Sequence, residues 1–152
     1  MEPTFVTIPA FSVVGMKYRG NNENNEIAQL WPKMLARVSE IKNIVDRNVS
    51  YGVQGNFNKE SGEFDYLAGY QVESYDELPE GFDVWNVTEQ TYAIFPCILP
   101  TLMDTFEYIY KKWLPNSSYS EGDGPEFELY GKEFFPDDPE SPMFIYIPVV
   151  MN

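Results

Sequence analysis

The chain contains no histidine and only one cysteine among its 152 residues. The absence of histidine excludes Ser-His-Asp and Cys-His nucleophile systems, histidine-ligated zinc and an imidazole general base. The single cysteine, Cys97, excludes an internal disulfide and is typical of a reducing compartment, so we expect a cytoplasmic protein. Its neighbours Pro96 and Ile98 carry no charge that would stabilise a thiolate, which predicts a buried, unreactive thiol.

Basic residues are also scarce, with 10 Lys and Arg against 24 Asp and Glu and a net charge of -14. This charge would repel phosphate backbones, so direct nucleic-acid binding is not expected. It would attract a cationic ligand or the basic surface of a protein partner, although it could equally serve solubility alone.

Several other signals are missing from the sequence. No apolar run approaches the roughly 18 residues of a membrane span, and no Gly-rich phosphate loop occurs. The acidic cluster of Asp137, Asp138 and Glu140 lacks the spacing of a calcium loop. We therefore expect no membrane association, no metal and no cofactor.

The chain has the composition of one globular domain over residues 1–152, with 43% hydrophobic and 16% aromatic residues. Alternating and β-branched patterns, separated by turn residues, predict eight strands. These strands cover residues 4–8, 11–18, 51–57, 64–72, 82–87, 91–95, 126–130 and 143–149. Apolar residues at helical spacing predict two amphipathic helices, over 27–41 and 99–113. Pro32 implies that the first helix either begins near Trp31 or is kinked there.

The order of these elements repeats along the chain. It predicts an α+β fold in which two pseudo-symmetric strand-helix-strand-strand halves form one antiparallel sheet with two helices on one face. Trp31, Phe106 and Ile109 are assigned to the core from their helical spacing.

The most specific motifs lie between the second helix and the next strand. They read Trp113-Leu114-Pro115, then Ser117-Ser118-Tyr119, then Gly124-Pro125-Glu126-Phe127-Glu128-Leu129-Tyr130. This pattern resembles the C-terminal half of GyrI-like domains, which bind small molecules in many bacterial transcription regulators and also occur as free-standing proteins. The resemblance extends more weakly to residues 51–53, 64–69 and 147–149. Family members often have Ser-Gly-Tyr where this chain has Ser117-Ser118-Tyr119.

The resemblance implies the same pseudo-symmetric fold and a ligand-facing acid at Glu128, while Glu126 stands where the family commonly has Asp. Side-chain alternation independently places Glu126, Glu128 and Tyr130 on one face of their strand. We expect Phe127 and Leu129 to face the helices, so that the acids line the opposite, concave face. Which of the two acids is the pocket acid is left open, and a plain exposed polar face is the alternative.

A buried, ionised glutamate costs several kcal/mol or takes up a proton. A lipophilic cation would relieve that cost, and aromatic rings would add roughly 0.5–2 kcal/mol each. Strand parity and the family layout give further candidate walls of an aromatic cleft, each of which could equally be core. They are Tyr51, Tyr66, Tyr70, Tyr92, Trp113 and Tyr146.

Three functions compete. The first is a stand-alone domain that binds amphipathic, cationic or aromatic compounds and sequesters them or signals through a partner. The second, implied by hydrolases in the family, is hydrolysis of strained, cyclopropane-bearing electrophiles, with Glu128 acting on water and Tyr130 or Trp113 stacking on the ligand. The third is inhibition of a protein partner such as DNA gyrase through the acidic surface.

Overall fold

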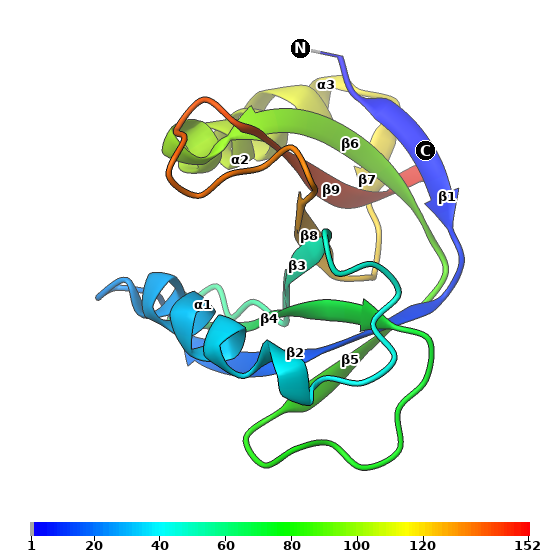
Figure 1. The fold of residues 1–152 in the computed structure, drawn as a ribbon. Coiled ribbons are helices and arrows are strands. Elements are labelled where there is room, and N and C mark those ends of the chain that lie inside the picture. The colour runs from blue at the N-terminus through cyan, green and yellow to red at the C-terminus, as the bar shows by residue number, and fades with distance from the viewer. Residues whose placement is uncertain (1) are drawn as a thin grey trace.

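The computed structural model describes residues 2–152 as a curved antiparallel sheet with helices on one side (Figure 1). All eight predicted strands are present, and β7 is an addition. The strands are β1 (Thr4–Ile8), β2 (Phe11–Gly20), β3 (Ser50–Gly55), β4 (Phe64–Val72), β5 (Asp83–Val87), β6 (Gln90–Ile98), β7 (Tyr119–Glu121), β8 (Glu126–Tyr130) and β9 (Pro142–Met151).

The sheet has the order β1-β6-β9-β8-β3-β4-β2-β5, and β7 pairs with β9. Strands β2, β4 and β3 belong to the first half of the chain, and their arrangement is matched by β6, β9 and β8 in the second half. The two halves meet where β3 pairs with β8, with Gly52 opposite Glu128. Each edge strand pairs with the other half of the chain. Strand β1, from the first half, pairs with β6, and β5, from the second half, pairs with β2. This arrangement confirms the predicted fold class.

The first helix, α1 (Glu26–Ala36), begins before Pro32 and ends well before the predicted limit at Ile41. Its first turn is fixed by side chains, since Asn22 Oδ1 accepts the Ile27 N–H at 3.0 Å and Tyr18 donates to Glu26 at 2.7 Å. A short 3-10 turn, η1 (Val38–Glu40), follows it. Of the two sequence alternatives, a start near Trp31 is therefore wrong.

The second helical segment is continuous and changes its winding along its length. It comprises η2 (Leu99–Thr101), α2 (Leu102–Tyr108), the π-helical η3 (Ile109–Trp113) and α3 (Leu114–Asn116). Ile109 is fully buried in the cluster that holds this segment on β6 and β9, together with Phe95 and Ile145. A π-helix widens the helix locally and occurs frequently at functional sites. Within residues 2–152 no helix is long and apolar enough to cross a membrane.

The predicted orientation of β8 is wrong. Tyr130 lies edge-on against Trp31 of α1, with 5.4 Å between ring centroids, so the face with Glu126, Glu128 and Tyr130 is the one that the helices cover. Phe127 lies on the other face, where Phe11 and Tyr92 both contact its ring, at 5.7 and 5.0 Å between centroids. Phe11 belongs to β2 and Tyr92 to β6, and four strands lie between these two in the sheet order, so the sheet bends around Phe127.

The orientation could not be predicted from alternation because both faces of the sheet carry a core. Two clusters hold the helices, one under α1 and one under α2 and η3, and a third fills the opposite face around Phe127. Strand β8 lies at the junction of the two halves, so its helix-side residues sit between the two helices.

Candidate functional site

Glu128 lies at the centre of a buried hydrogen-bonded group. Its Oε1 accepts bonds from the hydroxyls of Tyr66 at 2.9 Å and Tyr130 at 2.7 Å. Trp31 Nε1–H donates in turn to the Tyr66 hydroxyl at 3.1 Å, which ties α1 to β4 and β8. Glu128 is 5% exposed.

Gly52 makes room for this group. It lies directly opposite Glu128 in the β3–β8 ladder. A Cβ atom at this position would come within 2.0 Å of the Tyr66 hydroxyl oxygen and 2.8 Å of Glu128 Oε1. The missing side chain therefore lets the Tyr66 hydroxyl reach the carboxylate.

Glu126 forms a second, separate group on the same face. Tyr110 of the π-helical segment donates its hydroxyl to Glu126 Oε1 at 2.6 Å, and Gln54 Nε2 donates to Oε2 at 2.7 Å. Glu126 is also 5% exposed. Each acid thus accepts two hydrogen bonds from uncharged donors.

The pKa values of both carboxyl groups are raised. Burial raises the pKa of Glu126 to about 7, against the bonds from Tyr110 and Gln54, and the charges of Glu121 and Glu128 add to the rise. Burial also raises the pKa of Glu128, while bonds from Tyr130 and Tyr66 oppose the rise. Among residues 2–152, every ion pair involves other acids, so no Lys or Arg neutralises either carboxylate.

Aromatic rings enclose the two acids. Phe134, from the loop between β8 and β9, packs on Tyr130 with 4.7 Å between centroids, and Trp31 covers another side of the same ring. Trp31, Tyr110 and Phe134 are half-buried, whereas the carboxylates beneath them are buried. The structure thus shows a closed aromatic group around the acids, and an open cleft at this place stays a prediction.

The structure brings together only some of the residues that the sequence nominated. Glu128, Tyr66 and Tyr130 form one group, with Glu126 beside them. Tyr70 shares the helix-covered face but packs in the cluster with Met34. Trp113 lies on the same side of the sheet, where its ring contacts Phe95, Phe5 and Tyr119.

Three further candidates lie on the opposite face. Tyr51, Tyr92 and Tyr146 pack around Phe127, and the Tyr146 ring stacks on it with 4.4 Å between centroids. The sheet separates these three rings from Glu128. Placing them in one wall with Glu128 was wrong, because it rested on the reversed orientation of β8.

Sequence reasoning missed Gln54, Tyr110, Phe134 and the role of Gly52. It assigned Trp31 to the core, whereas Trp31 also donates a hydrogen bond inside the acid-centred group. Strand parity could have found Gln54, since Gln54 and Glu126 are register partners, but only with the β3–β8 pairing known. No sequence signal marks the π-helix that carries Tyr110.

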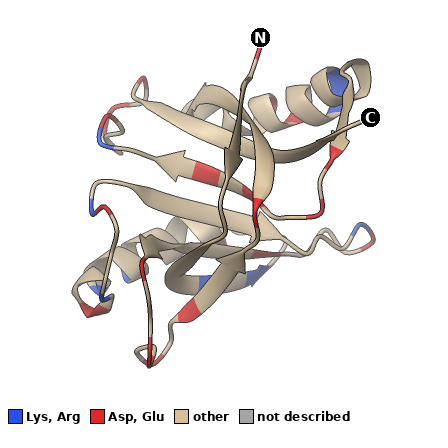
Figure 2. Ribbon diagram, turned by 90° about the vertical axis from the view of Figure 1, so that its right-hand side faces the viewer, with Lys and Arg blue, Asp and Glu red and all other residues tan. Residues whose placement is uncertain are grey.

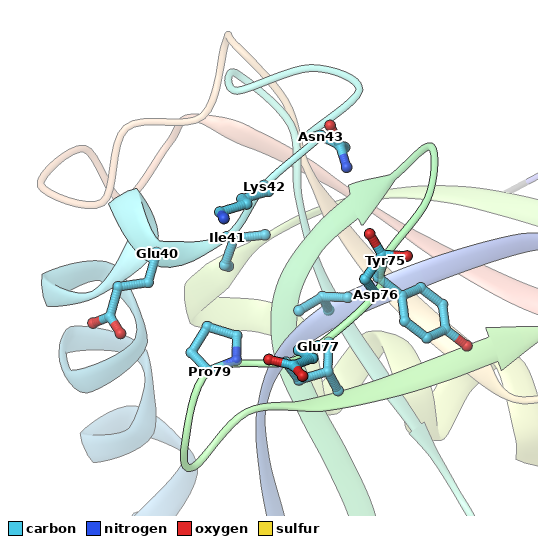
Figure 3. Close-up of a pocket in the computed structure, with 10 residues that line it drawn as sticks. Glu40, Ile41, Lys42, Asn43, Tyr75, Asp76, Glu77 and Pro79 are labelled. Carbon is cyan, nitrogen blue, oxygen red and sulfur yellow. The ribbon is translucent and has the colours of Figure 1, made fainter.

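A cavity of about 530 Å³ lies elsewhere, between the segment after η1 and the loop that joins β4 to β5 (Figure 3). Its walls include Glu40, Lys42, Asp76 and Glu77, which are exposed, and the buried side chain of Ile41. None of the nominated site residues lines it. We assign no ligand to this cavity, because its charged walls are mixed in sign and already solvated.

Comparison with known proteins agrees with the fold and the motifs. The family model described as "Cass2: Integron-associated effector binding protein" matches residues 4–149. The chain is 37% identical over 152 residues to the transcriptional regulator BrlR of Pseudomonas aeruginosa. That match covers 98% of this chain and 56% of the regulator, so the chain spans little more than half of its relative's length.

Two solved structures share the fold at low sequence identity. The structure of SAV2435 bound to tetraphenylphosphonium has a TM-score of 0.76 and 18% identity, covering 99% of this chain and 94% of that one. The integron cassette protein VCH_CASS2 of Vibrio cholerae has a TM-score of 0.67 and 18% identity, covering 99% and 97%. The resemblance to GyrI-like effector domains is confirmed. The chain belongs to the family of Cass2 integron-associated effector binding proteins.

Proposed function

We propose that residues 1–152 form an effector-binding domain that holds lipophilic organic cations between α1 and the π-helical segment. One observation carries the proposal. Glu126 and Glu128 are each 5% exposed, are enclosed by aromatic rings, and have no basic partner among residues 2–152.

A buried carboxylate without a cationic partner is energetically unfavourable, and a cationic ligand would offset that cost. A carboxylate removed from water is stabilised by hydrogen bonds, but its charge needs a cation or a proton. Tyr66 and Tyr130 supply hydrogen bonds to Glu128 without supplying positive charge. A greasy cation would supply the charge, and the rings of Trp31, Tyr130 and Phe134 would contact its apolar surface.

Binding requires the aromatic layer to open, because the acids are closed off in the free protein. Trp31, Tyr110 and Phe134 are the half-buried rings of this layer, so they are the ones that would have to move aside for a ligand. The net charge of -14 favours the approach of a cation from solution, and Figure 2 shows acidic residues spread over many loops and strand ends.

The relatives support this class of ligand. One protein of the same fold has a structure bound to tetraphenylphosphonium, an aromatic cation. The relative BrlR is a transcriptional regulator, so a role in sensing or sequestering effectors for gene regulation follows as part of the proposal. A cytoplasmic location stays a prediction from the single cysteine.

The test is calorimetric titration of the wild type and Glu128→Gln with tetraphenylphosphonium. Glutamine keeps the shape but removes the charge, so affinity should fall by about 1.5–3 kcal/mol, or tenfold or more. The exposed acid Glu60 provides a matched control, because Glu60→Gln changes the net charge equally and should bind like the wild type. Equal affinity in Glu128→Gln would show that the cation binds elsewhere or only through apolar contact.

A hydrolase remains the second candidate, because Glu128 has a raised pKa and a neighbouring phenol, as a general base would need. It would turn over a neutral, strained electrophile many times, and Glu128→Gln would abolish this turnover. Binding without product would exclude it. A gyrase-directed or other protein-interaction role stays a prediction from the acidic charge, and no particular surface of the described residues favours it.

A further inference from the structure

We infer that Glu126 is a second ligand-facing acid and that the site selects organic dications over monocations of the same shape. The inference rests on the proposed function and extends it by naming a ligand class and a specificity-determining residue. It follows from two carboxylates on one strand face, each of which accepts hydrogen bonds from its own set of donors.

The two acids are spaced and oriented for two charges. Glu126 and Glu128 alternate with Phe127 on β8, so both point to the helix-covered face. Alternate residues of a strand lie about 7 Å apart, which sets the scale of the distance between the charges of a complementary ligand. Each carboxylate has its own donors from different elements, Tyr110 and Gln54 for one and Tyr66 and Tyr130 for the other.

A monocation can neutralise only one of these acids. The groups that face the pair are phenols, the Gln54 amide, the Trp31 indole and the carboxylate of Glu121, and none of them carries positive charge. With a monocation beside Glu128, Glu126 would stay protonated or stay charged at a cost. A dication would neutralise both carboxylates at once and would displace any proton that the pair holds.

The acids are more than a cluster of negative charge. Both are buried beneath rings from α1, the π-helical segment and the β8–β9 loop, which suits a flat or aromatic ligand. Independently, a protein of the same fold has been solved with an aromatic cation bound. The ligand class that fits both observations is a compact aromatic dication with its charges at opposite ends.

Methyl viologen and 1-methyl-4-phenylpyridinium make a closely matched pair of probes, since both are para-linked pairs of aromatic rings and they differ by one charge and one terminal methyl group. The wild type should bind methyl viologen about tenfold more tightly or better, as measured by calorimetry at fixed ionic strength. In Glu126→Gln this preference should disappear. In Glu60→Gln, which changes the net charge equally at an exposed loop, the preference should persist.

A measurement on the wild type alone guards against misfolding of the variant. Titration in two buffers with different ionisation enthalpies counts the protons released on binding. Methyl viologen should release more protons at pH 7 than 1-methyl-4-phenylpyridinium does. Equal release would overturn the inference.

The outcomes separate this inference from the proposed function. If tetraphenylphosphonium binds but the wild type shows no preference for the dication, or the preference survives in Glu126→Gln, only the second acid's role is overturned. If none of the three cations binds, the proposed function and the inference both fall.

Discussion

On one face of β8, Phe127 stacks on Tyr146 and meets Tyr92, Tyr51 and Phe11 in a cluster of rings. On the other face, one residue away in sequence, Glu126 and Glu128 are buried beneath the helices with only neutral donors around them. The first face gains stability from apolar contact. The second gives up stability, because carboxylates have been removed from water without a cationic partner.

This difference indicates a division of roles between the two faces of a single strand. Buried charge without a cationic partner is rare in cores and costs stability, and this is the basis of the cation site that we propose. The Phe127 face, by contrast, contains no such unfavourable group, since its aromatic rings pack against one another. Mutations on the two faces should therefore separate stability from binding.

The largest expected effect is on the apolar face. Phe127→Ala removes the ring at the centre of that cluster and should lower the free energy of unfolding by about 3–5 kcal/mol. Urea denaturation followed by circular dichroism measures the change. Because the acids point away from this cluster, the folded fraction of the variant should bind tetraphenylphosphonium with wild-type affinity. A specific loss of affinity in the folded fraction would contradict the separation of the faces.

The acid face should respond to pH in the opposite sense from a typical salt-bridged carboxylate. Burial raises the pKa of Glu126 from the ordinary 4.5 to about 7, so the folded state holds a proton that the unfolded state releases. Stability from this group is therefore present below about pH 4.5 and is lost as pH rises toward 7. The shift corresponds to roughly 3 kcal/mol.

Glu126→Gln removes this dependence and should isolate it. Between pH 5 and pH 8, the variant should gain up to roughly 3 kcal/mol of stability relative to the wild type, as measured by urea denaturation at each pH. Glu60→Gln, at an exposed position, should follow the wild type across the same range. A difference between Glu126→Gln and the wild type that does not change with pH would show that Glu126 ionises normally in the folded protein.

The fold could be predicted because its signals are local. Alternation and helical spacing located eight strands and two helices, while β7 was missed because it is only Tyr119–Glu121 and pairs with the distant end of β9. Alternation also grouped Glu126, Glu128 and Tyr130 correctly. It could not decide which face the helices cover, since both faces of this sheet carry apolar clusters and a period of two is symmetric between them.

The partners of the acids depend on information that a single sequence does not contain. Gln54 reaches Glu126 only through the β3–β8 register, and Tyr110 reaches it from a π-helix that interrupts an ordinary amphipathic pattern. Tyr66 was found because strand parity and the family layout both indicated it. Trp31 has the spacing of a core residue and also takes part in the acid-centred group, so helical periodicity alone assigns it incompletely.

The smallest expected effect tests that double role of Trp31. Trp31→Phe keeps an aromatic ring near Tyr130 but removes the Nε1–H that donates to the Tyr66 hydroxyl at 3.1 Å. Stability should fall by about 1 kcal/mol, the typical net contribution of one such bond. Affinity for tetraphenylphosphonium should fall several-fold, because Phe binds cations more weakly than Trp and the Tyr66 hydroxyl is less well held.

Trp85 supplies the matched control, since it is half-buried against the Phe127 cluster on the opposite face. Trp85→Phe makes the same chemical change there and should alter stability without altering cation affinity. Calorimetry and urea denaturation on both variants measure the two quantities together. If Trp31→Phe changed stability alone, as Trp85→Phe should, Trp31 would be a core residue only and the ligand would have to contact the acids from another side.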